Sequence, residues 1–421
     1  MSEAQGQPAL PAINPFCPGW GARPLYLAGR LDEQRAFLAA LNHHIPTRNI
    51  LITGESGIGK TVLLAQFRKH ATQHHWLWTG SDWGEEPVVS EKDVATRLIV
   101  DLARVLAPVV GNRRRALPVD SAAAATVPDQ PATLADLWRI YNAESGSGSD
   151  KLKAMLKRVA EIISAAGLRG IVFAFDEAQN LGDKKDVKQF PLSLICEVFA
   201  WFQRRNSPCQ FRLVMAGQPP LATHLADART NRERIFHNLT VKRLVEAEIR
   251  DAIQKPLELI RSPLTFSEPA IACVVAESKG YPFLVHYICR ETYDAWTGCM
   301  SAGAIADVPM TAIAAKLDLD FFIPRWNRAT KRQQTFMQVI ATLPGADGEF
   351  LLQDITAASE SLLERPFTPS HAIQILGHLS AKGLIHRNRH GAYCFAVPML
   401  ASFIRRSVRD ASAGSDGSGG P

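Results

Sequence analysis

No two of the seven cysteines in this sequence form a Cys-x-x-Cys pair, and an odd number of them cannot all pair within the chain. This excludes the common zinc frameworks and a regular disulfide scaffold, so we expect most cysteines to be small buried hydrophobic residues. Long apolar runs are also lacking. None approaches the roughly 20 residues that a membrane-spanning helix needs, and residues 1–4 show neither region of a signal peptide. We therefore expect a cytoplasmic protein with no membrane partner.

A large excess of one charge is lacking as well. The net charge of +6 is modest for 421 residues, so the position of the charges matters more than their sum. A chain of this length is expected to form two or three domains. Prolines, an alanine run and a Gly-Ser repeat between residues 107 and 150 predict a partly ordered insertion. The small and polar residues 411–421 predict a disordered tail.

A complete phosphate-binding motif is present at residues 54–61. An apolar run at 50–53 enters it as a strand, and the following residues leave it as a helix. The glycines let successive N–H groups point at phosphate oxygens, and the helix N-terminus adds positive potential. Lys60 is predicted to reach the β- and γ-phosphates, and the Thr61 hydroxyl to hold Mg²⁺. The motif predicts ATP and Mg²⁺ as ligands. Its residues are Gly54, Glu55, Ser56, Gly57, Ile58, Gly59, Lys60 and Thr61.

A second motif is the apolar run at residues 170–175, which ends in Asp176 and Glu177. Such a run is typical of a parallel strand covered on both faces, whose carboxyl end is where ligands bind. Asp176 is predicted to hold Mg²⁺ and Glu177 to polarise the attacking water, which indicates hydrolysis. The alternative is a buried strand whose two acidic residues cap the next helix.

A third apolar run, at residues 211–216, ends in a Gly-Gln-Pro-Pro segment. Gln218 is a candidate contact to the γ-phosphate or the water, and the alternative is that this segment is only a turn. Beyond it, Arg229, Arg232 and Arg234 lie in a polar stretch. An arginine here, with Arg234 favoured, is expected to reach the γ-phosphate of a neighbouring subunit in a homo-oligomer. The alternative is a solvated arginine face.

In this order of motifs the sequence resembles AAA+ ATPases of the origin-recognition-like and STAND-related bacterial group, over roughly residues 25–300. The resemblance implies an α/β fold, with a P-loop NTPase parallel sheet as core and a helical lid. Lids of the group often carry a Gly-x-Pro-Arg signature, and here residues 280–283 end in Phe283, which cannot pair with phosphate. The expected parts are an N-terminal extension at 1–28, the nucleotide-binding core at 29–245, a helical lid at 246–320, a winged-helix domain at 321–410 and the tail at 411–421.

The C-terminal stretch 365–406 contains no Asp or Glu but many cations and histidines. A capped helix near residues 368–383 and two short strands resemble a winged helix. Arg387, Arg389 and His390 around the tip of the wing suit phosphate contacts to duplex DNA. The helix offers few base-reading side chains, so binding is expected to be weakly sequence-selective. The alternative is that the winged helix contacts an unknown protein partner.

These patterns together predict an ATP-hydrolysing AAA+ switch protein in a DNA-associated process such as transposition, replication initiation or defence. An alternative of a different class is a STAND-like signalling regulator. Such a protein would hydrolyse ATP slowly and use its winged helix for protein contacts.

Overall fold

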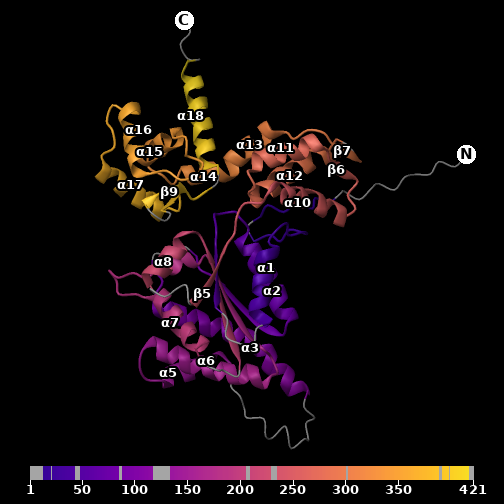
Figure 1. Cartoon of the computed structure of the whole chain (residues 1–421), viewed down its shortest axis with the longest axis vertical. Helices are drawn as coiled ribbons and strands as arrows, with labels where there is room; N and C mark the ends of the chain where they lie inside the picture. The colour runs from indigo at the N-terminus through magenta and orange to yellow at the C-terminus, as the bar shows by residue number, and fades with distance from the viewer. Residues whose placement is uncertain are drawn as a thin grey trace, which may run out of the picture. The chain divides into compact units, whose positions relative to one another are not determined.

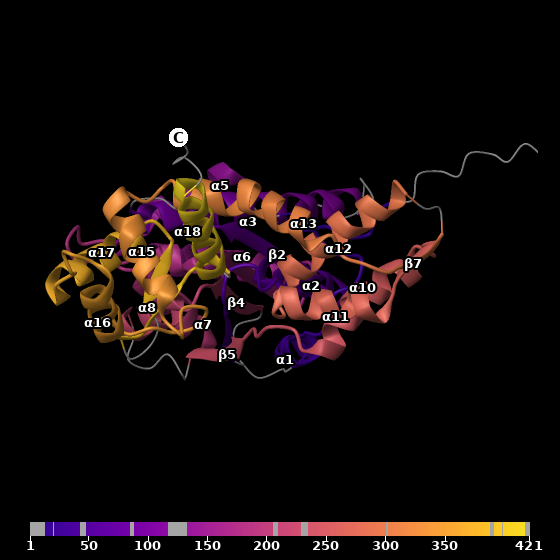
Figure 2. The ribbon, with the colours of Figure 1, turned by 90° about the horizontal axis from the view of Figure 1, so that it is seen from above.

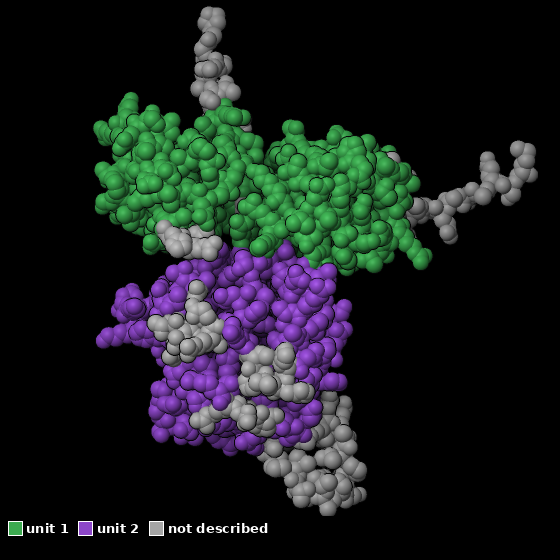
Figure 3. All heavy atoms as spheres, in the orientation of Figure 1, with its two compact units in different colours: residues 1–29, 55–59, 242–421 green, residues 30–54, 60–241 purple. Residues whose placement is uncertain are grey.

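The structure is a computed structural model of the chain, and it divides into two compact units (Figure 3). Residues 30–54 and 60–241 form one, here called the sheet unit. Residues 1–29, 55–59 and 242–421 form the other, here called the helical unit. The structure describes residues 13–19, 21–42, 48–84, 88–116, 133–204, 209–228, 235–299, 302–387, 391–397 and 399–416, without the side chains of 110–116 and 410–416.

A five-stranded parallel sheet forms the centre of the sheet unit (Figure 1). The strands lie in the order β2-β3-β4-β1-β5, and every neighbouring pair is parallel. Parallel neighbours need crossover connections, which helices provide here, so the predicted α/β fold with a parallel sheet is confirmed. The strands are β1 (Asn49–Thr53), β2 (Trp76–Asp82), β3 (Gly170–Asp176), β4 (Gln210–Gly217) and β5 (Phe236–Thr240).

Burial along the strands follows their place in the sheet. In β3 every residue before Asp176 is buried, and in β4 every residue after Gln210 is buried, as expected for central parallel strands. The edge strand β5 differs, because only Phe236 is buried while His237, Asn238 and Thr240 are exposed. The apolar runs in the sequence therefore identify the centre of the sheet and miss this edge.

Helices cover both faces of the sheet. Ile171, Phe173 and Phe175 of β3 share one core with α3, α6 and α7, and the alternate residues of β3 lie on the opposite face, where α2 packs. On the α2 side, Phe37 of α1 stacks on Phe67 of α2 with ring centroids 4.1 Å apart. The helices are α1 (Leu31–Asn42), α2 (Lys60–Gln73), α3 (Glu91–Ala116), α5 (Leu134–Ala143), α6 (Gly148–Ala165), α7 (Pro191–Gln203) and α8 (Pro220–Ala228).

Much of the segment predicted as a partly ordered insertion is helical. Residues 107–116 continue α3, and capping boxes at Thr133 and Ser147 begin α5 and α6. In each box the side chain accepts from the N3 amide, and the N3 aspartate accepts in return, so the first turn is satisfied. Residues 117–132 lie outside the described residues.

In the helical unit, four helices pack side by side in the group α10–α13 (Figure 2). They are α10 (Glu246–Leu259), α11 (Glu268–Ser278), α12 (Pro282–Thr297) and α13 (Met310–Leu317). A two-stranded parallel pair, β6 (Leu264–Phe266) and β7 (Gly303–Ile305), joins them. Phe16, far away in the sequence, is buried against Phe266 and Tyr293, and the Asn14 amide donates to Arg290 O and Asp294. The N-terminal segment is thus anchored on this group.

The rest of the helical unit begins with a π-helical turn, η2 (Asp318–Phe322), and α14 (Ile323–Trp326). It continues with α15 (Lys331–Thr342), α16 (Leu352–Leu362) and α17 (Pro369–Ala381), then the antiparallel hairpin of β8 (Ile385–Arg387) and β9 (Tyr393–Phe395), then α18 (Leu400–Asp416). Residues 411–416 of the segment predicted to be disordered continue α18, and residues 417–421 lie outside the described residues. Extending a formed helix by a few residues, alanines included, costs little. Within the described residues no helix is both long and apolar enough to cross a bilayer.

Candidate functional site

The first and last residues of the phosphate-binding motif lie in the sheet unit, where hydrogen bonds to backbone carbonyls hold Gly54 and Lys60. The Gly54 amide donates to Gly217 O at 3.3 Å, which joins the end of β1 to the end of β4. Lys60 begins α2, is 5% exposed, and its Nζ donates to Gly54 O at 3.0 Å. Gly59 has φ of +96°, a conformation that suits glycine. The Lys60 ammonium is therefore held beside the first residue of the motif by a backbone carbonyl.

Two of the predicted ligands for Mg²⁺ touch each other. The Thr61 hydroxyl donates to Asp176 Oδ2 at 2.6 Å, and Asp176 Oδ1 accepts from the Glu177 amide at 3.0 Å. A hydroxyl and a carboxylate at the carboxyl end of β3 are oxygen ligands of the kind that Mg²⁺ takes beside a phosphate, so the pair fits this ion. In the described part of the chain, no group of three or more His, Cys, Asp or Glu side chains could form a protein-only metal site.

Glu177 has a left-handed backbone conformation, with φ of 49° and ψ of 35°. A residue other than glycine in this region costs roughly 1–3 kcal/mol and is found where a particular side-chain direction is needed. The strand thus ends at Asp176, and the chain turns at Glu177 into the short 3₁₀-helix η1 (Ala178–Leu181). Glu177 Oε2 accepts from Gln179 Nε2 at 2.5 Å.

Gln218 lies at the tip of β4, beside these groups. Its backbone amide donates to Gln179 Oε1 at 3.0 Å, so the structure brings Gln218, Gln179 and Glu177 together. Sequence reasoning missed Gln179. The residue stands two positions after Glu177, and the available signal was an amide side chain just after the two carboxylates.

A third carboxylate stands beside Asp176. Asp82 is the last residue of β2 and pairs in register with Asp176 across the parallel ladder. Partial burial raises the pKa of Asp82, the charge of Asp176 raises it further, and Arg97 opposes both effects. Sequence reasoning missed Asp82 too, because its strand has no recognisable motif and register cannot be read from one strand alone.

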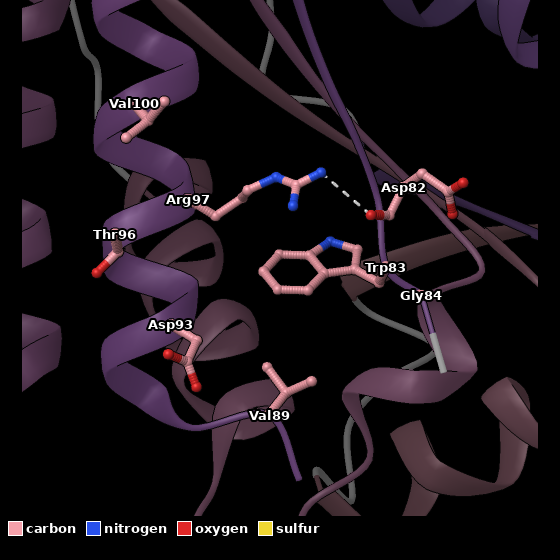
Figure 4. Close-up of a pocket in the computed structure, with 8 residues that line it drawn as sticks. All are labelled: Asp82, Trp83, Gly84, Val89, Asp93, Thr96, Arg97 and Val100. Carbon is pink, nitrogen blue, oxygen red and sulfur yellow. Dashed lines mark hydrogen bonds between the residues drawn. The ribbon is translucent and has the colours of Figure 1, made fainter. Parts of the chain in front are cut away.

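A cavity of about 210 Å³ opens next to Asp82 (Figure 4). Arg97 of α3 donates to Asp82 O at 3.2 Å, and its guanidinium lies 5.7 Å from the centroid of the Trp83 ring. None of the residues of the phosphate-binding motif lines the cavity. The lining is Asp82, Trp83, Gly84, Val89, Asp93, Thr96, Arg97 and Val100.

The middle of the phosphate-binding motif, residues 55–59, groups with the helical unit. Glu55 forms an ion pair with Arg243 at 3.3 Å, and the Arg243 guanidinium lies 4.3 Å from the centroid of the Tyr281 ring. The Phe283 amide donates to Gly57 O at 3.4 Å. Burial and Glu55 raise the pKa of the Tyr281 hydroxyl. Although the segment 280–283 has no arginine, the structure thus places Arg243 beside it, a residue that sequence reasoning missed.

The remaining predicted residues are only partly described. Arg229, Arg232 and Arg234, and the wing residues Arg389 and His390, lie outside the described residues. Arg387 is exposed at the end of β8.

Three other cations of the basic C-terminal stretch contact protein groups. Lys382 donates to Arg328 O and Gln333, Arg405 pairs with Asp347 at 2.8 Å, and Arg406 pairs with Asp318 at 2.5 Å. These three positive charges are therefore engaged by contacts within the helical unit.

Residues 26–195 match the family model of the AAA ATPase domain, and residues 319–404 match a domain of unknown function, DUF8462. None of the curated proteins that were compared matches the chain.

Several solved structures are similar to this chain in fold at low sequence identity. The Aeropyrum pernix ORC2 protein in ADPNP–ADP complexes is 14% identical with a TM-score of 0.51, over 94% of this chain and 98% of that one. The Aeropyrum pernix ORC1 protein in complex with DNA is 15% identical with a TM-score of 0.45, over 93% and 95%. The Thermotoga maritima RuvB Holliday junction branch migration motor is 16% identical with a TM-score of 0.42, over 88% and 94%. Residues 26–195 are thus similar to the AAA ATPase domain, and the chain has an α/β fold with a parallel sheet like that of AAA+ P-loop NTPase structures.

Proposed function

We propose that this protein binds ATP with Mg²⁺ and hydrolyses it to ADP and phosphate. The observation that carries the proposal is the set of contacts from Thr61 through Asp176 to Glu177, with Lys60 held at the end of the same motif. A structural use of the two carboxylates as helix caps is less compatible with it, because Asp176 bonds the Thr61 hydroxyl and Glu177 makes no side-chain cap bond to η1.

In this mechanism the residues 54–61 bind the phosphates through backbone N–H groups and the Lys60 ammonium. Thr61 and Asp176 would hold Mg²⁺, which supplies positive charge beside the phosphates. Glu177 accepts a proton from the attacking water as the new oxygen–phosphorus bond forms. The bond between the γ-phosphorus and the bridging oxygen breaks, and its electron pair leaves with ADP.

The test compares two variants. Glu177→Gln keeps the size of the side chain but removes the base, so we expect ATP binding to persist while kcat falls by roughly 10²- to 10⁴-fold. Lys60→Ala removes the buried cation, so we expect nucleotide affinity to fall by about 10- to 100-fold. Calorimetry measures affinity, and phosphate release measures turnover.

Each variant has a matched control in the sheet unit. Glu161→Gln removes the charge of an exposed residue of α6, and Lys69→Ala removes an exposed lysine of α2, so both should behave as wild type. Loss of affinity in Glu177→Gln equal to its loss of turnover would assign Glu177 a structural role. A wild-type protein that binds no ATP would refute the proposal.

We further propose that the helical unit comprises a lid at 246–320 and a winged helix at 321–410, and that the protein acts as a switch in a DNA-associated process such as transposition. Support comes from the order of α15, α16, α17, β8 and β9, and from the exposed Arg387. A homo-oligomer in which Arg234 reaches the neighbouring γ-phosphate belongs to the same proposal.

A second candidate is a slowly hydrolysing regulator whose winged helix contacts protein. The observation that favours it is the internal use of Lys382, Arg405 and Arg406, which leaves fewer cations for nucleic acid.

A further inference from the structure

Gln179 links the end of β3 to the end of β4 through both atoms of its side-chain amide. Nε2 donates to Glu177 Oε2 at 2.5 Å, and Oε1 accepts from the backbone amide of Gln218 at 3.0 Å. The orientation of the amide is defined by its neighbours. A backbone N–H can only donate, so the oxygen of Gln179 must face Gln218, and the nitrogen must face the carboxylate.

Three further contacts fix the position of Gln179 and of the turn that carries it. A Cβ on Gly217 would lie 2.5 Å from Gln179 Oε1 and 2.9 Å from Leu221 Cδ2, so no side chain fits between β4 and the amide. The carbonyl of Gln179 accepts from His224 Nδ1 of α8 at 3.1 Å. Burial lowers the pKa of His224, which favours the neutral ring. A carbonyl can only accept, so the proton of that ring lies on Nδ1. The next residue, Asn180, donates to Trp83 O at 2.7 Å and so ties η1 to the end of β2.

Among the described residues, the hydrogen bond from Gln179 is what holds the Glu177 side chain. Glu177 follows the strand in a left-handed conformation, and its carboxylate is half-buried. A bond that fixes Oε2 leaves Oε1 to receive a proton, in a direction set by the rigid turn. A displacement of the proton acceptor by about 1 Å can lower the rate roughly 10²-fold, so a bond that fixes the Glu177 carboxylate bears directly on turnover.

We propose that Gln179 is a positioning residue that orients Glu177 for proton transfer and couples it to the tip of β4 at Gly217 and Gln218. This role of Gln179 rests on the proposed ATP hydrolysis and adds a residue to its mechanism. Any displacement of the Gln218 backbone reaches the Glu177 carboxylate through one amide group, so the two strand ends act together on the attacking water.

Two substitutions separate the two bonds. Gln179→Met keeps the length of the side chain but loses both. Gln179→Glu keeps the acceptor for the Gln218 amide, loses the donor to Glu177 and sets a second carboxylate against it. We expect both variants to lower kcat by about 10²-fold, with KM and the affinity for a non-hydrolysable ATP analogue within twofold of wild type. Gln66→Met on α2 is the matched control and should leave kcat unchanged.

A double variant tests whether Gln179 acts through Glu177. In a Glu177→Gln background, Gln179→Met should cause no further loss of kcat, because the group it positions is gone. Thermal melting of each variant checks that it is folded. If Gln179→Met misfolds, Gln179→Glu carries the test.

Four outcomes would overturn the inference. They are a kcat for Gln179→Glu equal to wild type, a kcat above wild type, a fall in kcat matched by an equal fall in nucleotide affinity, and a full further loss in the double variant. A wild-type protein that binds ATP without turnover would instead refute the proposed hydrolysis, and the inference with it.

Discussion

His286 of α12 is buried, and its Nδ1 has no hydrogen-bond partner in the described chain. Loss of hydration disfavours the imidazolium and lowers the pKa of His286 to about 4, from 6.5. Between these two pH values the unfolded chain binds a proton that the folded chain does not. The free energy of unfolding should therefore decrease as pH falls from 6.5 to 4, by up to about 3 kcal/mol from this residue.

Urea unfolding of wild type and His286→Phe at pH 7.5, 6.5, 5.5 and 4.5 measures this contribution, because Phe does not titrate. Carboxylates add their own loss on the acid side in both proteins. One is Asp347, whose pKa burial raises but Lys279 and Arg405 together lower by more. The difference between the two curves isolates His286. Equal losses of stability in wild type and in both His286→Phe and His286→Gln would contradict the prediction.

Residue roles were harder to predict than residue types. Gly54, Lys60, Thr61 and Asp176 follow from their spacing, because backbone curvature and metal chemistry demand those residues at those places. Gln179, Asp82 and Arg243 could not be found in this way. Each lies beside a residue that is distant in the sequence: Gln179 beside Gln218, Asp82 beside Asp176, and Arg243 beside Glu55. One sequence does not specify the register between parallel strands that brings such residues together.

At the level of elements, the N-terminal segment is more than an extension. Phe16 is 2% exposed and packs edge-on against Phe266 and Tyr293, with ring centroids 5.9 and 6.2 Å away. We expect Phe16→Ala to lower the free energy of unfolding of the helical unit by about 3–5 kcal/mol, because a cavity replaces a buried ring. Denaturant unfolding gives the value.

The matched change Ile13→Ala should alter stability by less than about 0.5 kcal/mol, since Ile13 is 80% exposed. A Phe16→Ala protein as stable as Ile13→Ala would show that the segment does not stabilise the α10–α13 group.

The central strands were predictable because their apolar runs end at motifs, as in β1, β3 and β4. The edge strand β5 and the short pair β6 and β7 were not, since polar or three-residue strands leave no periodic signal. The extension of α18 through residues 411–416 was not anticipated for a related reason. Composition indicates which segments lack a core, but a helix that already has an apolar face can continue into such a segment.

For the molecule as a whole, the proposed DNA contact can be tested through salt. On this proposal the wing residues bind phosphates, which carry no base information, so Arg387→Ala combined with Arg389→Ala should weaken duplex binding almost equally for unrelated sequences. Each lost contact should reduce the slope of log affinity against log salt by about 0.9. Basal ATP hydrolysis should stay near wild type, because Arg387 and the residues Lys60, Asp176 and Glu177 belong to different compact units.

Fluorescence anisotropy over a salt series gives the slope, and Arg139→Ala, on an exposed arginine of α5, is the control. An unaltered slope in the double variant, or no affinity of wild type at low salt, would favour the protein-contact function.

The polar edge strand β5 bears on how this protein behaves at high concentration. Strand β5 is an edge of the five-stranded sheet. The backbone N–H and C=O groups on the outer side of an edge strand can pair with a strand of another chain. His237, Asn238 and Thr240 make β5 a poor template, because neither an apolar face nor a strongly β-forming run is offered to a second strand. Variants that make β5 more apolar would therefore gain little for the core and would promote aggregation.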